Sequence, residues 1–199
     1  MTAKMRAAGA SFSTRSRIRR LPTPPRPRQP SARRTRSMMF PSAQAIAKLV
    51  GNVSGRVLDV AAGHGLFGIV LAQQNPGVRL TALDWPNVLD VARRNAARMG
   101  VDERFTTIAG DAFQVELQGP YDLILLTNLL HHFSAEQCTT LLKRLRGALR
   151  PGGRLVTLEF VPNEDRVSPP MSAGFSLVML ATTAGGDAYT YAELVKMLG

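Results

Sequence analysis

Few side chains in this sequence can ligate a metal or form a disulfide. The 199 residues include one cysteine, Cys138, and three histidines. One cysteine excludes an internal disulfide, and the histidines lack the spacing of a zinc site, so we expect no metal. No apolar run is long enough to span a bilayer, and no secretory signal lies near the start. We therefore expect a cytoplasmic protein without a membrane partner.

Acidic residues are absent from the first forty positions. This segment holds eleven of the 25 Lys and Arg residues and none of the 14 Asp and Glu residues. Residues 41–199 therefore balance 14 basic against 14 acidic side chains, and the net charge of +11 belongs to residues 1–40. The charge of the whole chain thus does not by itself predict a nucleic-acid partner for the remaining residues.

Residues 1–40 are rich in Arg, Pro and Ser, which predicts a disordered segment. Three interpretations are open: a basic arm that binds nucleic acid or an anionic membrane, an organelle transit peptide, or translation from outside the proper reading frame. The abrupt change of composition near Met38 favours the third. Residues 41–199 are long enough to form one folded domain.

From Ser42 onward, segments with the apolar period of helices and strands alternate. Predicted strands cover residues 56–61, 78–84, 105–110, 121–128 and 154–161, and predicted helices cover residues 42–50, 66–74, 86–99, 134–149, 168–183 and 190–199. The helix over residues 168–183 is expected to break at Pro169-Pro170 and at Gly174. This alternation predicts an α/β fold with a doubly wound, mostly parallel sheet, which binds ligands at the carboxyl ends of its strands.

A turn of small residues follows the first predicted strand. Asp59 ends the strand, and Ala61, Gly63 and Gly65 follow in the pattern Asp-x-Ala-x-Gly-x-Gly. This spacing differs from the dinucleotide fingerprint G-x-G-x-x-G. A Cβ in such a turn would collide with a nucleotide or with the packing of strand on helix, so these residues are candidates for cofactor binding. A tight turn in some other α/β protein is the alternative.

Acidic residues also end the next two strands. Asp84 can accept hydrogen bonds from ribose hydroxyls, or it can cap the helix that starts at Pro86. Asp111 can accept a hydrogen bond from an adenine amino group while Phe113 covers the ring. Alternatively, Asp111 forms a turn and Phe113 belongs to the core. Because NAD enzymes also use an acid such as Asp84, this residue alone does not identify the cofactor.

Thr127 and Asn128 end the fourth strand, and two histidines follow them. Polar residues at the end of a buried strand are expected to point into the ligand crevice. A neutral imidazole can take a proton from a hydroxyl group near pH 7. Adjacent histidines face different ways, so at most one of His131 and His132 serves as a base. A histidine that only hydrogen-bonds the loop is the alternative.

Residues 42–199 resemble the catalytic domain of class I S-adenosylmethionine (SAM)-dependent O-methyltransferases of the caffeate, hydroxyindole and acetylserotonin type. Residues 59–65, 84–86, 110–113 and 129–133 and the Pro-Gly-Gly turn at 151–153 carry the resemblance. It implies that a small-molecule hydroxyl, typically phenolic, is the methyl acceptor, that His131 is the general base and that Glu159 orients it. It also implies a set of SAM-binding residues: Asp59, Ala61, Gly63, Gly65, Asp84, Trp85, Asp111, Phe113 and Thr127.

This chain departs from the family pattern at several points. Family members carry an N-terminal helical domain that forms the dimer and covers the substrate pocket, and here only its last helix, residues 42–50, is matched. Ala188 stands where the family has a second supporting Glu, and we expect the fold to lack the family's antiparallel strand pair after the last helix. We therefore expect a complete SAM site, an incomplete acceptor site, and a homodimer only where the helical domain is present.

Three other functions stay open. A SAM-binding but catalytically defective fragment would have the same fold. A nucleic-acid-directed methyltransferase would use the basic arm, but residues 41–199 carry no excess of positive charge and lack an Asn-Pro-Pro-Tyr motif. An NAD-dependent enzyme is disfavoured by the spacing of Ala61, Gly63 and Gly65 and by residues 110–113.

Overall fold

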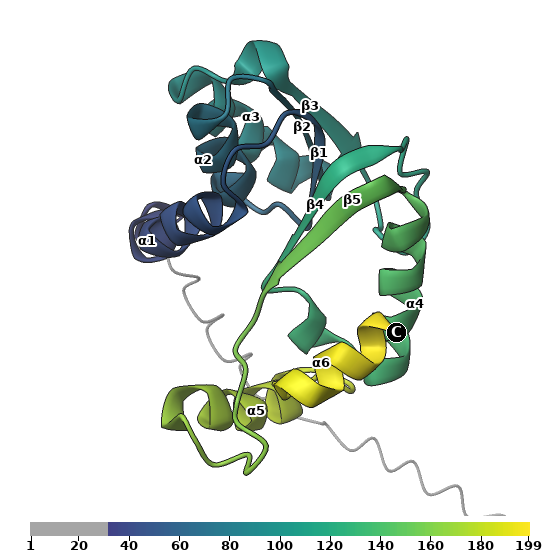
Figure 1. The fold of residues 1–199 in the computed structure, drawn as a ribbon. Helices are drawn as coiled ribbons and strands as arrows, with labels where there is room; N and C mark the ends of the chain where they lie inside the picture. Colours follow the sequence, from purple (N-terminus) through teal and green to yellow (C-terminus); the bar gives the residue numbers. More distant parts are fainter. Residues whose placement is uncertain (1–31) are drawn as a thin grey trace, which may run out of the picture.

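The computed structural model describes the backbone of residues 32–199 and the side chains of residues 39–199. Five strands, all paired in parallel, form one sheet in the order β3-β2-β1-β4-β5 (Figure 1). They are β1 (Gly55–Val60), β2 (Val78–Asp84), β3 (Phe105–Ala109), β4 (Tyr121–Thr127) and β5 (Leu149–Leu158). The strand order reverses between β1 and β4, which confirms the predicted doubly wound α/β fold and creates a crevice at the strand ends.

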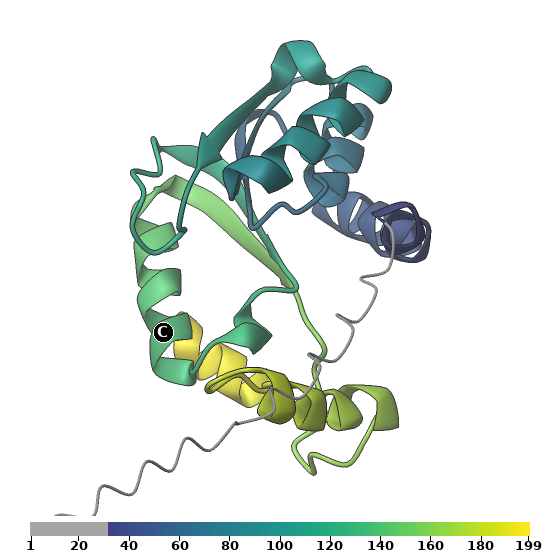
Figure 2. The same ribbon diagram turned by 180° about the vertical axis from the view of Figure 1, so that it is seen from behind.

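Helices cover both faces of this sheet. The six described α-helices are α1 (Ala32–Val50), α2 (Leu66–Gln74), α3 (Pro86–Arg98), α4 (Ala135–Gly147), α5 (Pro170–Thr182) and α6 (Tyr191–Leu198). Two single-turn 3-10 helices are η1 (Asp102–Arg104) and η2 (Leu130–His132). Helices α1, α2 and α3 pack on one face and α4 and α6 on the other, whereas α5 lies beyond the carboxyl ends of β4 and β5 (Figures 1 and 2).

Strand β4 is buried on both faces, as its continuous apolar sequence predicts. Leu123 and Leu125 pack into the cluster that contains α1 and α2. Ile124 and Leu126 pack into the cluster that contains α4 and α6. All four side chains are fully buried, so β4 fixes the position of the loop that follows it.

Helix α1 begins at Ala32, and the prediction that it starts at a Ser42 cap is wrong. Ala43 and Ile46 are buried against α2, and Met39 and Phe40 pack against the same cluster. Pro41 lies inside the helix, where proline removes one backbone hydrogen bond, and the packing of Met39 and Phe40 offsets that cost. Residues 32–40 are therefore helical rather than disordered, and residues 1–31 of the Arg- and Pro-rich segment lie outside the described residues.

Two further elements, β5 and α5, differ most from their predicted bounds, and β5 ends at Leu158 rather than at residue 161. Strand β5 begins at Leu149 rather than Arg154, because the Pro-Gly-Gly segment at 151–153 forms a bulge that shifts the register against β4. Helix α5 starts at Pro170 and continues through Gly174 without the predicted break. Proline suits the first position of a helix, and one internal glycine costs only about 1 kcal/mol.

Side-chain caps fix the starts of α4 and α6, as predicted. The Ser134 hydroxyl accepts a hydrogen bond from the Gln137 N–H, and the Thr190 hydroxyl accepts one from the Glu193 N–H. In both helices the third residue also bonds back to the cap backbone, which completes a capping box. The cap at Ser134 ends the loop that carries the two histidines.

Helix α5 keeps most of its apolar side chains exposed. Met171 and Leu180 are 78% and 76% exposed, whereas Met179 is buried. The helix therefore gains little stability from burial of its own side chains. Within residues 32–199, no helix combines the length and the apolar character needed to cross a membrane.

Candidate active site

The turn after β1 holds three residues in the left-handed backbone region. The angle φ is 52° at Ala61, 58° at Gly63 and 78° at Gly65. A Cβ on Gly65 would come within 2.9 Å of Ile69 and 3.2 Å of Ala92, so only glycine fits where the turn passes between α2 and α3. A Cβ on Gly63 would meet open space, so the backbone there is accessible to a ligand.

The Asp84 carboxylate ties the ends of β1 and β2 together. Its Oδ2 accepts a hydrogen bond from the Gly63 N–H at 2.8 Å, and its Oδ1 accepts one from the Trp85 N–H at 2.7 Å. Trp85 is the N-cap residue of α3, and no side chain caps that helix. The alternative interpretation of Asp84 as a helix cap is therefore wrong. The carboxylate fixes the glycine turn and has further lone pairs for ligand hydroxyls.

Asp59 lies behind the glycine turn rather than at its surface. The side chain is buried, its Oδ2 accepts a hydrogen bond from the Gly68 N–H at 3.0 Å, and its Oδ1 has no partner among the described residues. Burial raises the pKa of the Asp59 carboxyl to about 7. The hydrogen bond from Gly68 opposes this shift, and the negative charge of Asp84 adds to it. Asp59 thus supports the turn from the protein interior.

Asp111 and Phe113 form a compact loop after β3. Asp111 Oδ1 accepts a hydrogen bond from the Phe113 N–H at 2.9 Å, which closes a local turn. The Phe113 ring makes an edge-on contact with Phe133, with ring centroids 5.0 Å apart. This contact joins the loop after β3 to the loop after β4.

Arg144 of α4 fixes the far side of the same loop. Its Nε donates to the carbonyl oxygen of Ala112 at 3.1 Å, and Nη2 donates to that of Val115. A Cβ on Gly110 would collide with Val115, so the loop can close only with glycine at that position. Helix α4 therefore positions the Asp111–Phe113 segment through one side chain.

A hollow, here called the strand-end hollow, opens between these loops. Its lining residues are Ala61, Leu83, Asp84, Trp85, Gly110, Asp111, Ala112, Phe113, Leu129 and Phe133. A wider depression of about 720 Å³ shares Trp85, Asp111, Phe113 and Phe133 with it and continues along α4. Carboxylates and aromatic rings thus converge on one concave surface, as in small-molecule sites.

One carboxylate holds the loop after β4. Glu159 Oε1 accepts hydrogen bonds from the N–H groups of Leu129 at 2.9 Å and Leu130 at 2.8 Å. Its Oε2 lies 2.5 Å from Nδ1 of His131, and both side chains are buried. Because the two imidazole nitrogens lie on different sides of the ring, His131 Nε2 faces away from this carboxylate.

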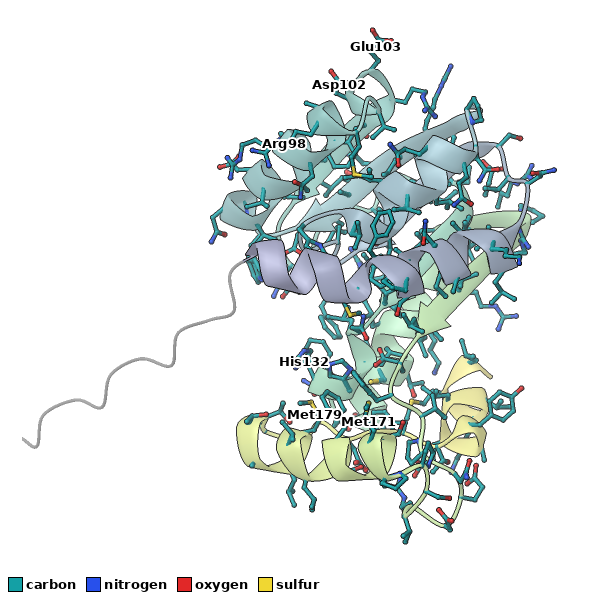
Figure 3. The ribbon with its side chains drawn as sticks, turned by 90° about the vertical axis from the view of Figure 1, so that its left-hand side faces the viewer. Arg98, Asp102, Glu103, His132, Met171 and Met179 are labelled. Carbon is teal, nitrogen blue, oxygen red and sulfur yellow. The ribbon has the colours of Figure 1, made fainter. Side chains whose placement is uncertain are left out.

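His132 has a different environment from His131. Its side chain is exposed, and its ring centroid lies 4.3 Å from that of His131. Partial burial and the neighbouring His131 lower the pKa of His132. The negative charge of Glu159 acts in the opposite direction and raises it. Figure 3 shows His132 in the region between the sheet and α5.

Aromatic side chains lie beside the His131 ring. Phe175 of α5 makes an edge-on contact with His131 at 4.9 Å between centroids, and the two planes are 87° apart. Phe160 stacks on Phe175 with centroids 4.2 Å apart. The imidazole therefore borders an apolar, aromatic surface that α5 and the segment after β5 build together.

A family model described as the O-methyltransferase domain matches residues 36–199. The chain belongs to this family. Acetylserotonin O-methyltransferase of Mus musculus is 33% identical over 135 residues, which cover 66% of this chain and 35% of that protein. The 3-hydroxy-5-methyl-1-naphthoate 3-O-methyltransferase of Streptomyces sahachiroi is 33% identical over 143 residues, which cover 72% of this chain and 41% of that protein.

Solved structures also resemble this O-methyltransferase domain. A protein of Nostoc punctiforme assigned as an O-methyltransferase has a TM-score of 0.79 and 50% identity, over 81% of this chain and 49% of its own. Human N-acetylserotonin methyltransferase in complex with SAM has a TM-score of 0.70 and 27% identity, over 82% of this chain and 46% of its own. The chain thus spans less than half the length of each of these four proteins.

The O-methyltransferase domain gathers only part of the predicted site at the strand-end hollow. Thr127 is 6% exposed at the end of β4 and is not among the lining residues. Gly63 and Gly65 shape the turn without lining the hollow, and His131 and Glu159 are not among its lining residues either. No cluster that could hold a metal ion occurs within residues 32–199. The predicted residues that line the hollow are Ala61, Asp84, Trp85, Asp111 and Phe113.

Several residues that fix the site were not predicted from the sequence. Asn95 of α3 donates a hydrogen bond to the carbonyl oxygen of His64 at 2.8 Å and so holds the glycine turn. A Cβ on Gly186 would collide with the carbonyl oxygen of His131. The third such residue is Arg144, which donates hydrogen bonds to the carbonyl oxygens of Ala112 and Val115. A polar residue on the apolar face of α3 was the available signal for Asn95, whereas nothing in the sequence pattern indicated the partners of Gly186 or Arg144.

Proposed function

We propose that this chain binds SAM at the strand-end hollow and transfers its methyl group to a phenolic hydroxyl of a small molecule. The observation that carries the proposal is the 2.5 Å contact between buried His131 Nδ1 and Glu159 Oε2. The same loop contributes Leu129 and Phe133 to the lining of the hollow. A candidate base and a candidate cofactor site are therefore adjacent.

The chemistry of the hollow fits SAM. The Asp84 carboxylate would accept hydrogen bonds from the ribose hydroxyls, and the Asp111 carboxylate would accept one from the adenine amino group. Trp85 is 56% exposed, so its ring is available to cover a nucleoside. The open space beside Gly63 lets the turn approach a ligand closely. When bound, SAM supplies a methyl group attached to a positively charged sulfur. Transfer of the methyl group breaks the carbon–sulfur bond and leaves the sulfur as a neutral thioether.

His131 is the proposed general base. With a proton on Nδ1 shared with Glu159, the lone pair of Nε2 can take the proton of an acceptor hydroxyl. The buried Glu159 carboxylate would stabilise the imidazolium that forms, because charges interact more strongly away from water. General-base catalysis of this kind contributes a factor of about 10² to 10⁴ in rate.

The surroundings of His131 favour a flat aromatic acceptor. Phe160 and Phe175 present a stacked pair of rings next to the imidazole, and a phenol could pack against them. Two names among the relatives support this class: the naphthoate 3-O-methyltransferase and the acetylserotonin O-methyltransferase. Selectivity within the class would depend on residues 160–186, which lie around α5.

Calorimetric titration of the full chain with S-adenosylhomocysteine tests the cofactor half of the proposal. We expect saturable binding that Asp84→Ala weakens strongly, because the variant loses the ribose acceptor and the anchor of the Gly63 N–H. Transfer of a radiolabelled methyl group to a panel of phenols tests the second half. Binding without transfer to any phenol would support a SAM-binding protein without activity. A well-folded chain that binds no S-adenosylhomocysteine would overturn the cofactor assignment.

A further inference from the structure

The segment between α5 and α6 packs against the loop that carries the proposed base. We call residues 183–190 the α5–α6 connection; they run from the C-cap of α5 to the N-cap of α6. Four of them are buried, namely Gly186, Ala188, Tyr189 and Thr190. Most apolar side chains of α5 are exposed by contrast, so the connection fits more closely against the domain than the helix before it.

The first contact of the connection is with the backbone of His131. A Cβ on Gly186 would collide with the His131 carbonyl oxygen and would lie 2.9 Å from the backbone carbon of His132. Only glycine fits this close approach while the loop keeps its place. One residue earlier, a Cβ on Gly185 would make an ordinary contact with Ser134 at 3.5 Å. The close approach is therefore confined to one position of the connection.

The second contact is a hydrogen bond to the same loop. Tyr189 Oη donates to the carbonyl oxygen of Phe133 at 2.6 Å. Sγ of Cys138 also approaches this oxygen, at 3.7 Å, but a thiol is a weak donor. Phe133 lines the strand-end hollow and makes the edge-on contact with Phe113. Tyr189 thus holds the backbone of a residue whose ring borders the candidate cofactor site.

Hydrogen bonds and ion pairs hold the connection itself in place. Thr183 Oγ1 accepts a hydrogen bond from the Gly186 N–H at 2.8 Å, and the capping box of α6 begins at the last residue of the connection. Arg166, in the segment before α5, binds Asp187 at 2.9 Å and Glu193 of α6 at 2.5 Å. Three charges in one network hold their geometry better than an isolated exposed pair. The connection can therefore support the loop that it contacts.

We propose that the α5–α6 connection positions the active site at two separate points, with Gly186 positioning His131 and Tyr189 positioning Phe133 in the wall of the strand-end hollow. Both are positioning residues, since neither lines the hollow. Both roles rest on the proposed function, because His131 is its base and the hollow is its cofactor site. The two contacts serve different halves of the site, so their loss should affect turnover and cofactor affinity differently.

Gly186→Ala in the full chain tests the first contact. The added methyl group has to displace the His131 carbonyl, so we expect kcat at saturating SAM to fall roughly tenfold or more. The Kd for S-adenosylhomocysteine should stay within about twofold, because His131 does not line the hollow. Gly185→Ala is the matched control. Its methyl group meets only Ser134 at an ordinary distance, so kcat should not change.

Tyr189→Phe tests the second contact, because it removes one hydroxyl group and keeps the buried ring. We expect the Kd for S-adenosylhomocysteine to rise roughly fivefold, since Phe133 is no longer held. Tyr121→Phe is the matched control. Tyr121 is also buried, and its Oη donates to the carbonyl oxygen of Leu117 at 2.5 Å, but at the amino end of β4. Urea denaturation should show similar losses in both variants, whereas only Tyr189→Phe should change the Kd.

Amide hydrogen exchange in residues 129–133 gives a measurement that needs neither SAM nor an acceptor. Exchange should be faster in Gly186→Ala and Tyr189→Phe than in the wild-type protein, and unchanged in the two controls. Faster exchange in a protein that binds no S-adenosylhomocysteine would contradict the proposed function but not the support of this loop by the connection. Unchanged exchange would show that the loop does not depend on the connection.

Two further results would overturn the inference. The first is an unchanged kcat in Gly186→Ala together with an unchanged Kd in Tyr189→Phe. The second is a change of Kd in Tyr121→Phe as large as that in Tyr189→Phe, which would assign both hydrogen bonds to general stability rather than to the site.

Discussion

The Glu159 carboxylate lies 2.5 Å from Nδ1 of His131 and also accepts the backbone N–H groups of Leu129 and Leu130. One side chain therefore orients the imidazole and shapes the loop that carries it. Glu159 both orients the imidazole and holds the loop in place. A variant of Glu159 therefore has to be compared with a variant of His131 to separate these two effects.

Replacement of His131 should affect turnover far more than cofactor binding. In His131→Ala we expect methyl transfer to fall by about 10² to 10⁴, because the proton acceptor is lost. The Kd for S-adenosylhomocysteine should stay within about twofold, since His131 does not line the strand-end hollow. His132→Ala, at the exposed neighbour, is the control and should retain most activity. Full activity in His131→Ala would show that the base is another group.

Replacement of Glu159 should reduce both stability and turnover. Glu159→Ala leaves the two loop N–H groups and the His131 imidazole without their acceptor, at a cost of about 2 to 4 kcal/mol in the free energy of unfolding. Glu159→Gln keeps a carbonyl acceptor for the loop, so it should recover much of the stability while turnover stays low. Urea denaturation of both variants measures the first effect. If Glu159→Gln restores turnover as well, the negative charge is not needed at this position.

The buried Asp59 carboxyl should make stability depend on pH. Burial is the main reason that its pKa rises from 3.8 to about 7 in the folded chain. The native state therefore keeps a proton that the unfolded chain releases, so the stabilisation is complete below about pH 4 and is lost as pH rises to about 7. The loss in free energy of unfolding is up to about 4 kcal/mol, because one pKa unit corresponds to about 1.36 kcal/mol.

Asp59→Asn isolates this contribution, because an amide resembles the protonated acid. We expect the variant to match the wild-type protein at about pH 4 and to exceed its stability at about pH 8. Urea denaturation at both pH values gives the difference. A difference between the two proteins that does not change with pH would contradict the raised pKa.

Loss of the Arg144 guanidinium should loosen the cofactor site. Arg144→Met keeps an aliphatic stem on α4 but gives up the hydrogen bonds to the carbonyl oxygens of Ala112 and Val115. We expect the Kd for S-adenosylhomocysteine to rise roughly tenfold, because the Asp111–Phe113 loop is no longer fixed. Arg144→Lys should restore part of the affinity, and Lys143→Met on the same helix should have no effect. If Arg144→Met binds S-adenosylhomocysteine as tightly as the wild-type protein does, the Asp111–Phe113 loop keeps its conformation without Arg144.

The sequence was informative where a residue type has a strong local requirement. Gly65 cannot carry a Cβ between α2 and α3, and Ser134 and Thr190 cap helices, so these positions were predictable. The start of α1 was not, because packing of Met39 and Phe40 extends the helix beyond its local signals. The contacts of Arg144 were not predictable either. Their acceptors are backbone carbonyl groups, which every residue has, so no sequence pattern indicates them.

Ala61 is the one residue with a Cβ among the three positive-φ residues of the glycine turn. A side chain in the left-handed region costs roughly 1 kcal/mol, and the Ala61 angle φ of 52° lies in that region. The spacing of the turn indicated a close approach of backbone to ligand, but the strain at its first position became visible only from the dihedral angle.

Glu159 follows directly after β5, the strand with only one neighbour among the described strands. Edge strands open locally at a lower free energy than central ones, and amide exchange is faster there. Opening of the end of β5 would release three hydrogen-bond partners of Glu159 at once, the two loop N–H groups and the His131 imidazole. The orientation of the proposed base is therefore coupled to the pairing of β5 with β4.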